Sequence, residues 1–222
     1  MAASDDTARF SILRQRMVDS QLRARGIADE RVLSAMARLP RHEFAPEPYR
    51  DQAYEDHPLP IAQGQTISQP YIVALMLEAL ALRPTDRVLE VGTGSGYVTA
   101  LLAALAAQVI SVERHAVLAD SSRELLTRMQ YNNLRIIVGD GTRGVPECAP
   151  YDAIMVSAAA PEIPPALLAQ LAEGGRMIIP VGTHDSQQLQ LIRVENGQPR
   201  ITLRELCRFV PLVPGEPSSP SC

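Results

Sequence analysis

The stretch Val88-Leu-Glu-Val-Gly92-Thr-Gly94-Ser-Gly96-Tyr97 decides the fold. Residues 88–91 form an apolar run typical of a buried β-strand, and the closely spaced glycines predict a sharp turn into a helix over 97–107. A second apolar run, 109–112, predicts the next parallel strand of a βαβ unit. Glu113 follows it, 21 positions after Gly92, where a carboxylate can accept hydrogen bonds from a ribose diol. The pattern predicts a nucleoside-binding crevice.

Helix and strand patterns alternate outside this stretch. They predict a helix over 7–25, a second helix capped by Asp29 that stops before Pro40, further helices over 70–80, 116–130 and 164–171, and strands over 87–91, 109–113, 134–138, 151–157 and 176–180. Two last strands, 187–194 and 201–211, are joined by the turn Asn196-Gly197. This order predicts an α/β fold: a doubly wound, mostly parallel Rossmann-like sheet with an N-terminal helical region and a C-terminal antiparallel hairpin.

The length of 222 residues and the apolar content of 46% suit one domain. We predict a single domain over 1–213, in which 7–84 supply N-terminal helices and a substrate or lid segment and 85–213 form the Rossmann-like core. Within the first part, residues 41–69 are irregular and rich in Pro and Gly, which is typical of segments that carry function. The Pro/Ser-rich tail, 214–222, is predicted to be disordered.

Composition excludes several chemistries. All 21 basic residues are arginine, so a phosphate-binding P-loop lysine, a lysine Schiff base and a lysine general base are impossible. A net charge of −4 argues against nucleic acid as a partner. The four histidines show no metal-ligand spacing, so no metal is predicted.

The cellular setting is predicted from cysteines and apolar runs. Cys148, Cys207 and Cys222 form no C-x-x-C pair and are expected to be reduced. The N-terminus lacks the basic and apolar regions of a signal peptide, and the longest apolar run, near 98–107, is too short to span a membrane. These features predict a cytoplasmic protein without membrane contact.

The glycine pattern distinguishes between nucleoside cofactors. A dinucleotide fingerprint is G-x-G-x-x-G, whereas this chain has G-x-G-x-G followed by Tyr97 and no basic residue in the loop. S-adenosylmethionine fits better, because it has a ribose and an adenine but no phosphate, and its carboxylate can lie near the amides of a helix start. Asp140, in Gly139-Asp140-Gly141 after the third strand, can accept a hydrogen bond from the adenine amino group; alternatively, this tripeptide is a plain turn.

A more specific motif precedes the glycine loop: Gly64-Gln-Thr-Ile-Ser-Gln-Pro-Tyr71. With Pro40-Arg41-His42-x-Phe44 and Pro180-Val181-Gly182, it resembles the protein-L-isoaspartate O-methyltransferase family, and the resemblance runs from about residue 10 to 212. The glycine loop alone resembles class I methyltransferases in general. The chain departs from the family pattern at Ala62, Val98 and Ser157, where Gly, Gln and Thr are expected.

The resemblance implies methyl transfer from S-adenosylmethionine to the free α-carboxylate of L-isoaspartyl residues in damaged peptides and proteins. The reaction would initiate repair through a succinimide and leave S-adenosylhomocysteine. It also implies isoaspartyl-containing proteins and peptides as partners. Separately, the chain is expected to be a monomer. The implied site residues are Ser68 as the catalytic residue; Thr66, Ile67, Ser157, Ala158 and Ala159 for substrate; and Gln65, Tyr71, Glu90, Gly92, Thr93, Gly94, Gly96, Glu113, Arg114, Asp140 and Gly141 for cofactor.

This reaction requires little of the side chains. A backbone carboxyl with a pKa of about 3.5–4 is an anion at neutral pH, so catalysis needs alignment rather than a general base. Ser68 also has a purely structural alternative, as the N-cap of the helix that starts at Pro70. Alternative functions are a methyltransferase for a small molecule or RNA, an NAD-dependent oxidoreductase, which Tyr97 disfavours, and a non-catalytic cofactor- or peptide-binding module.

Overall fold

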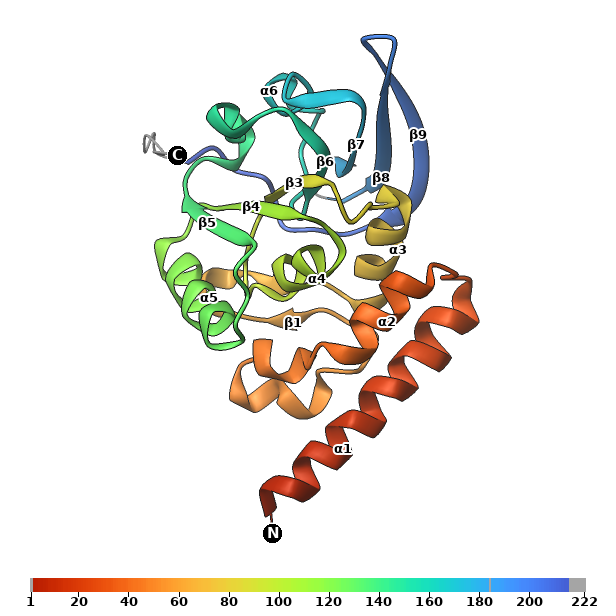
Figure 1. The fold of residues 1–222 in the computed structure, drawn as a ribbon, viewed down its shortest axis with the longest axis vertical. Coiled ribbons are helices and arrows are strands. Elements are labelled where there is room, and N and C mark those ends of the chain that lie inside the picture. Colours follow the sequence, from red (N-terminus) through yellow and green to blue (C-terminus); the bar gives the residue numbers. More distant parts are fainter. Residues whose placement is uncertain (1, 184, 216–222) are drawn as a thin grey trace.

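The computed structural model describes residues 2–183 and 185–215, with side chains from residue 8 onward. Its centre is a seven-stranded sheet of order β5-β4-β3-β6-β7-β8-β9 (Figure 1). The strands are β3 (Arg87–Val91), β4 (Gln108–Glu113), β5 (Leu134–Val138), β6 (Tyr151–Val156), β7 (Leu171–Gly182), β8 (Gln187–Glu195) and β9 (Gln198–Cys207). Of the tail predicted to be disordered, residues 216–222 lie outside the described residues.

The first five strands in this order are parallel to one another, and β8 pairs in antiparallel fashion with both β7 and β9. In β3 the side chains of Val88, Leu89 and Val91 are at most 1% exposed, as expected for a parallel strand covered on both faces. The predicted fold class is therefore confirmed. Parallel strands also bring their carboxyl ends to one edge, where ligands bind in such sheets.

The two faces of the sheet are covered unequally. Val88 and Val109 share one apolar cluster with α3 (Pro70–Leu80), α4 (Tyr97–Leu105), α5 (Ala116–Arg128) and the N-terminal helices. Leu89 and Ile110 point into a second cluster, covered by short segments that include η6 (Gly141–Arg143), η7 (Pro146–Cys148) and α6 (Pro165–Leu168). The helix predicted over 164–171 is thus too long, because Leu171 already pairs with Tyr151 as the first residue of β7.

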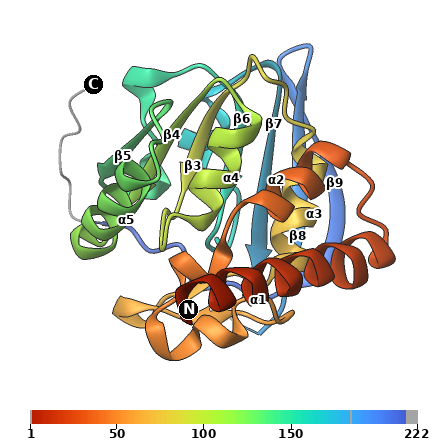
Figure 2. The ribbon, with the colours of Figure 1, turned by 60° about the horizontal axis from the view of Figure 1, so that its bottom comes forward.

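The N-terminal region continues from α1 (Ala2–Arg16) through a π-helical turn, η1 (Met17–Leu22), and a 3-10 turn, η2 (Arg23–Arg25). Gly26, with φ of 95°, ends this run. The helix α2 (Glu30–Arg38) follows, and the Asp29 carboxylate caps it by accepting a hydrogen bond from the Arg31 amide at 2.8 Å. Figure 2 shows α1 on the outside of this region.

The Pro/Gly-rich segment contains short elements: η3 (Arg41–Phe44), η4 (Glu47–Gln52), η5 (Ala62–Gly64) and a small antiparallel pair, β1 (Leu59–Pro60) with β2 (Thr66–Ile67). Asp56 ties it to the start of α3. One Asp56 carboxylate oxygen accepts from the Tyr71 amide at 3.2 Å, and the other accepts from the Gln69 side chain at 2.9 Å and pairs with Arg25. The guanidinium of Arg25 stacks on the Tyr71 ring at 3.4 Å.

The C-terminal hairpin turns at Asn196 and Gly197, whose φ values are 54° and 70°, as a two-residue turn of this kind requires. β9 ends at Cys207, earlier than predicted, and the chain then returns to the carboxyl end of β6. There the Ala159 amide donates to the Val210 carbonyl at 2.8 Å, and the Leu212 amide donates to the Ala159 carbonyl at 2.7 Å. Residues 208–213 thus join the ligand-binding edge of the sheet.

Two findings bear on the predicted cellular setting. Cys207 is a free thiol, but Cys148 is disulfide-bonded, so the prediction that every cysteine is reduced is wrong at Cys148. Within residues 2–183 and 185–215, no helix has the length and apolar character needed to cross a membrane.

Candidate active site

The glycine loop joins β3 to α4 at the carboxyl edge of the sheet. Gly92, Gly94 and Gly96 have φ of 96°, 54° and 86°, values that residues with a side chain rarely adopt. A Cβ on Gly96 would also lie 3.2 Å from Leu126 and Ser122, which is unusually tight. At Gly92 and Gly94, in contrast, a Cβ would make only ordinary contacts. The loop therefore brings bare backbone to the edge of a cavity.

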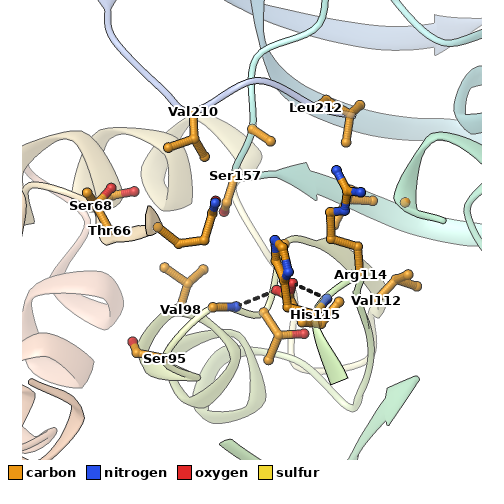
Figure 3. A pocket seen from close by; sticks show the side chains of 18 of the residues that line it. Thr66, Ser68, Ser95, Val98, Val112, Arg114, His115, Ser157, Val210 and Leu212 are labelled. Atoms are coloured by element: carbon orange, nitrogen blue, oxygen red, sulfur yellow. Dashed lines mark hydrogen bonds between the residues drawn. The ribbon is translucent and has the colours of Figure 1, made fainter. Parts of the chain in front are cut away.

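This cavity has a volume of about 750 Å³, counting space open to solvent. Figure 3 shows Ser68 and Thr66 on one side of it, Arg114 and Val112 on the other, and Ser157, Val210 and Leu212 along a third. Its lining comes from residues 65–68, 91–95, 97–98, 112–115, 141, 157–158 and 210–213. Segments distant in sequence therefore meet around one space.

Glu113 lines this cavity and holds two backbone segments beside it through hydrogen bonds. Its side chain is only 5% exposed, and its two oxygens accept hydrogen bonds from the amides of Gly94 and His115, each at 2.9 Å (Figure 3). A carboxylate has about four acceptor positions, so Glu113 can hold the loop and still accept hydrogen bonds from a ligand. This is the behaviour required of a residue that binds a diol.

Glu90 lies below the glycine loop and does not line the cavity. One of its oxygens accepts from the hydroxyls of Thr99 at 2.5 Å and Ser111 at 2.6 Å, and the Ser111 hydroxyl lies 2.5 Å from that of Thr93 in the loop. Complete burial, with a smaller contribution from the charge of Glu113, raises the pKa of Glu90 to about 8. At neutral pH Glu90 is therefore mostly a neutral acid that supports the loop through hydroxyl groups.

The cavity brings together most of the residues that the sequence singled out. Those that line it are Gln65, Thr66, Ile67, Ser68, Gly92, Thr93, Gly94, Glu113, Arg114, Gly141, Ser157 and Ala158. The helix-cap alternative for Ser68 is wrong, because Gln69 occupies the N-cap position of α3 and no side chain caps this helix. The Ser68 side chain therefore lines the cavity without serving as the cap of α3.

Other predicted residues do not line the cavity. Tyr71 lies under Arg25, Gly96 is the N-cap of α4, and Ala159 bonds the returning C-terminal segment through its backbone. Asp140 caps η6, where its carboxylate accepts from the Thr142 amide at 2.9 Å, and its side chain lines a neighbouring cavity with Gly139. These residues and Glu90 therefore lie close in the chain to residues that line the cavity, without lining it themselves.

Sequence reasoning missed several lining residues: Ser95, Val98, His115 and 210–213. Ser95 lies within the glycine loop and Val98 follows it by two residues, so position along the chain could have identified them. Residues 210–213 carry no motif and reach the cavity only through the backbone pairing with Ala159. Nothing local in the sequence indicates that pairing.

A second cavity of about 640 Å³, counting open space, adjoins the first. Thr66, Ser68, Ser157 and Val210 line both cavities. The rest of the second lining consists of Pro58, Gln69, Ile72 and residues 206–209. The two cavities therefore meet at a common boundary, here called the shared wall, which carries three hydroxyl groups.

Among the described residues, no three His, Cys, Asp or Glu side chains cluster in a way that could hold a metal ion. The polar groups that surround the two cavities are hydroxyls, backbone amides, one carboxylate, the Cys207 thiol and the side chains of arginine, histidine and glutamine.

A parallel sheet, a glycine loop without basic residues and an acidic residue after the next strand define a Rossmann-like nucleoside-binding protein of the class I methyltransferase type. The model of the family described as protein-L-isoaspartate(D-aspartate) O-methyltransferase (PCMT) matches residues 13–217. The chain belongs to this family, so the resemblance found in the sequence is confirmed.

Individual relatives agree with this assignment. The protein-L-isoaspartate O-methyltransferase of Koribacter versatilis is 56% identical over 221 residues, which cover 100% of each chain. That of Methanoculleus marisnigri is 56% identical over 201 residues, covering 90% of this chain and 91% of the relative. A putative family member from Plasmodium falciparum, solved in complex with S-adenosyl-L-homocysteine, superposes with a TM-score of 0.79 at 31% identity, covering 90% of this chain and 98% of that one.

The neutral state of Glu90 gives a testable pH dependence. Its pKa is raised on folding, so its contribution to stability is complete below about pH 4.5 and is lost as pH rises to about 8. Glu90→Gln removes this loss. Between these pH values the unfolding free energy of the variant should therefore decline less steeply than that of wild type, by at most about 1.4 kcal/mol per pH unit. Urea unfolding followed by circular dichroism measures both slopes.

Glu124→Gln, on the exposed face of α5, is the matched control and should keep the wild-type slope. If Glu90→Gln has the same slope as wild type, Glu90 is ionised in the folded protein and the neutral acid is refuted.

Proposed function

We propose that this protein transfers a methyl group from S-adenosylmethionine to the free α-carboxylate of L-isoaspartyl residues in damaged peptides and proteins, initiating repair through a succinimide. The observation that carries the proposal is the shared wall of the two cavities, formed by Thr66, Ser68, Ser157 and Val210. A group-transfer enzyme needs donor and acceptor to meet at such a place. Family membership supplies the identity of the two ligands.

The first cavity suits the donor. Glu113 can accept from a ribose diol, Val112 and Leu212 offer apolar surface for a base, and the backbone of Gly92 and Gly94 allows close approach. No basic residue lies in the loop, as expected for a ligand without phosphate groups. When bound, S-adenosylmethionine supplies an electrophilic methyl group on a sulfonium centre. The relative from Plasmodium falciparum was solved with the corresponding product, S-adenosyl-L-homocysteine.

The shared wall suits an anionic acceptor. A carboxylate needs no base, and the hydroxyls of Thr66, Ser68 and Ser157 can donate hydrogen bonds that orient it. Arg208, in the second cavity, adds a positive charge that favours an anion. Orientation of two reactants can lower a barrier by up to roughly 7–11 kcal/mol in favourable cases. We assign the main orienting role to Ser68, which lines both cavities.

Cys207 lies at the second cavity and is the nucleophile that would compete with the acceptor. Burial raises the pKa of its thiol to about 11, so the reactive thiolate is scarce at neutral pH. The acceptor site can therefore hold a sulfur atom near the methyl donor without becoming methylated itself.

We further propose a division of labour within a single domain, 1–213. The N-terminal part, 7–84, supplies Thr66 and Ser68, and the core, 85–213, supplies the glycine loop and Glu113. The enzyme would act as a monomer in the cytoplasm, without nucleic acid or membrane as a partner; the net charge of −4 supports the first of these exclusions.

The central test is labelled methyl transfer from S-adenosylmethionine to a peptide with one L-isoaspartyl residue, compared with the matched aspartyl peptide. We expect a base-labile methyl ester on the first peptide only, because only the isomer presents a free backbone carboxylate. Equal labelling of both peptides would refute the selectivity. Cofactor binding without transfer to either peptide would indicate a different acceptor or a binding module.

Glu113→Ala tests the donor site. Hydrogen bonds to a charged group contribute about 1.5–3 kcal/mol each, so affinity for S-adenosylhomocysteine, measured by calorimetry, should fall at least about tenfold. Glu124→Ala, which removes an exposed carboxylate from α5, should bind as wild type does. Unchanged affinity in Glu113→Ala would remove Glu113 from the donor site.

Ser68→Ala tests the shared wall. Loss of the orienting hydroxyl should lower kcat/KM for the isoaspartyl peptide at least about tenfold, equivalent to about 1.4 kcal/mol, while affinity for S-adenosylhomocysteine stays within about twofold. Ser11→Ala, at an exposed position of α1, is the control. Full turnover in a folded Ser68→Ala variant would contradict the role of Ser68.

A further inference from the structure

Arg41 has the largest side chain among the fully buried residues of the described chain, with 0% of its surface exposed. It lies in η3 and contacts three separate segments. Its Nε donates to the Ala53 carbonyl at 2.7 Å, one terminal nitrogen donates to the Ser68 carbonyl at 2.9 Å, and the guanidinium carbon lies 4.8 Å from the centre of the Tyr97 ring. The Arg41 guanidinium therefore connects the irregular segment at Ala53, the shared wall at Ser68 and the start of α4 at Tyr97.

Burial of this cation is unfavourable by itself. Removing a charge from water costs several kcal/mol, and burial lowers the pKa of the Arg41 guanidinium. The other buried arginine, Arg176, forms an ion pair with Asp86, whereas no carboxylate of the described residues forms one with Arg41. An apolar side chain could fill the same volume without this cost. What the guanidinium adds to this volume is two donors, Nε and one terminal nitrogen, which a rigid planar group holds at a fixed angle toward two carbonyls.

The two partners of Arg41 nearest the cavities are parts of the site. Ser68 lines both cavities and Tyr97 lines the first. Directly after Ser68 in the chain, Asp56 accepts hydrogen bonds from the Gln69 side chain and the Tyr71 amide. The chain around Ser68 is thus held by a buried cation at Ser68 itself and by a carboxylate at the next residues.

We propose that Arg41 is a positioning residue for methyl transfer: it fixes the backbone of Ser68 relative to Tyr97, so that the Ser68 hydroxyl keeps a constant place between the two cavities. The inference rests on the proposed function. Arg41 itself touches neither cavity, and its effect on turnover passes through Ser68.

The substitution Arg41→Lys keeps the charge but replaces the planar fork with a single ammonium group, and Arg41→Gln keeps hydrogen-bond donors without the charge. The matched control is Arg31→Lys, because Arg31 also bridges two carbonyls, those of Leu82 and Leu105, away from the cavities. We expect kcat for the isoaspartyl peptide to fall at least about tenfold in Arg41→Lys, with affinity for S-adenosylhomocysteine within about threefold of wild type. Arg31→Lys should keep wild-type kcat.

A double-mutant cycle separates positioning from a general structural effect. If Arg41 acts through Ser68, Arg41→Lys should change kcat by less than about threefold in the Ser68→Ala background. Hydrogen exchange gives a readout without activity: amides of residues 66–71 should exchange at least about tenfold faster in Arg41→Lys than in wild type. If Arg41→Lys does not fold, the same measurements are made on Arg41→Gln.

Wild-type kcat in a folded Arg41 variant, or an equal loss of kcat with and without Ser68, would overturn the positioning role. If the wild-type protein does not methylate the isoaspartyl peptide, the proposed function fails instead. In that case, hydrogen exchange still reports whether Arg41 holds residues 66–71, and an unchanged exchange rate would overturn the inference independently.

Discussion

The hydrogen bonds that the Glu113 carboxylate accepts from two backbone segments are the interaction on which the whole site depends. Glu113, at the end of β4, accepts from the amides of Gly94 and His115, which fixes the glycine loop against the neighbouring strand. The loop can accept this geometry only because its glycines adopt positive φ. A second carboxylate, Glu90, lies close below and is kept neutral mainly by burial. Glu113 is therefore the one carboxylate, among the described residues that line the donor site, that supplies negative charge there.

The acceptor side is built differently, from irregular backbone rather than from strands. Arg41 and Asp56 hold the segment around Ser68 through hydrogen bonds. The chain after β9 reaches the shared wall by backbone pairing with Ala159. Such a construction suits a reaction that depends on alignment, since the reacting carboxylate supplies its own negative charge. Rigid placement of neutral hydroxyl groups is what the surrounding structure provides.

The sequence predicted those parts of the molecule that depend on local patterns. The strands 87–91 and 134–138 and the helix 70–80 have the predicted bounds, because glycine, proline and apolar runs mark their ends. The cofactor and acceptor motifs were likewise visible as Gly92–Gly96 and Gly64–Tyr71. Where the prediction was wrong, tertiary pairing decided: Leu171 joins β7 because it pairs with Tyr151, although its surroundings read as a helix. Residues 210–213 reach the cavity only by pairing with Ala159, which no local pattern encodes.

The wall shared by the two cavities has a consequence for biosynthesis. It combines Thr66 and Ser68 with Val210, so its two sides leave the ribosome at very different times. The glycine loop and β3 to β7 are synthesised before β8 and β9, but both cavities lack part of their lining until residues 210–213 have emerged. A partly synthesised chain would contain the glycine loop and Glu113 but would lack the residues that complete the two cavities.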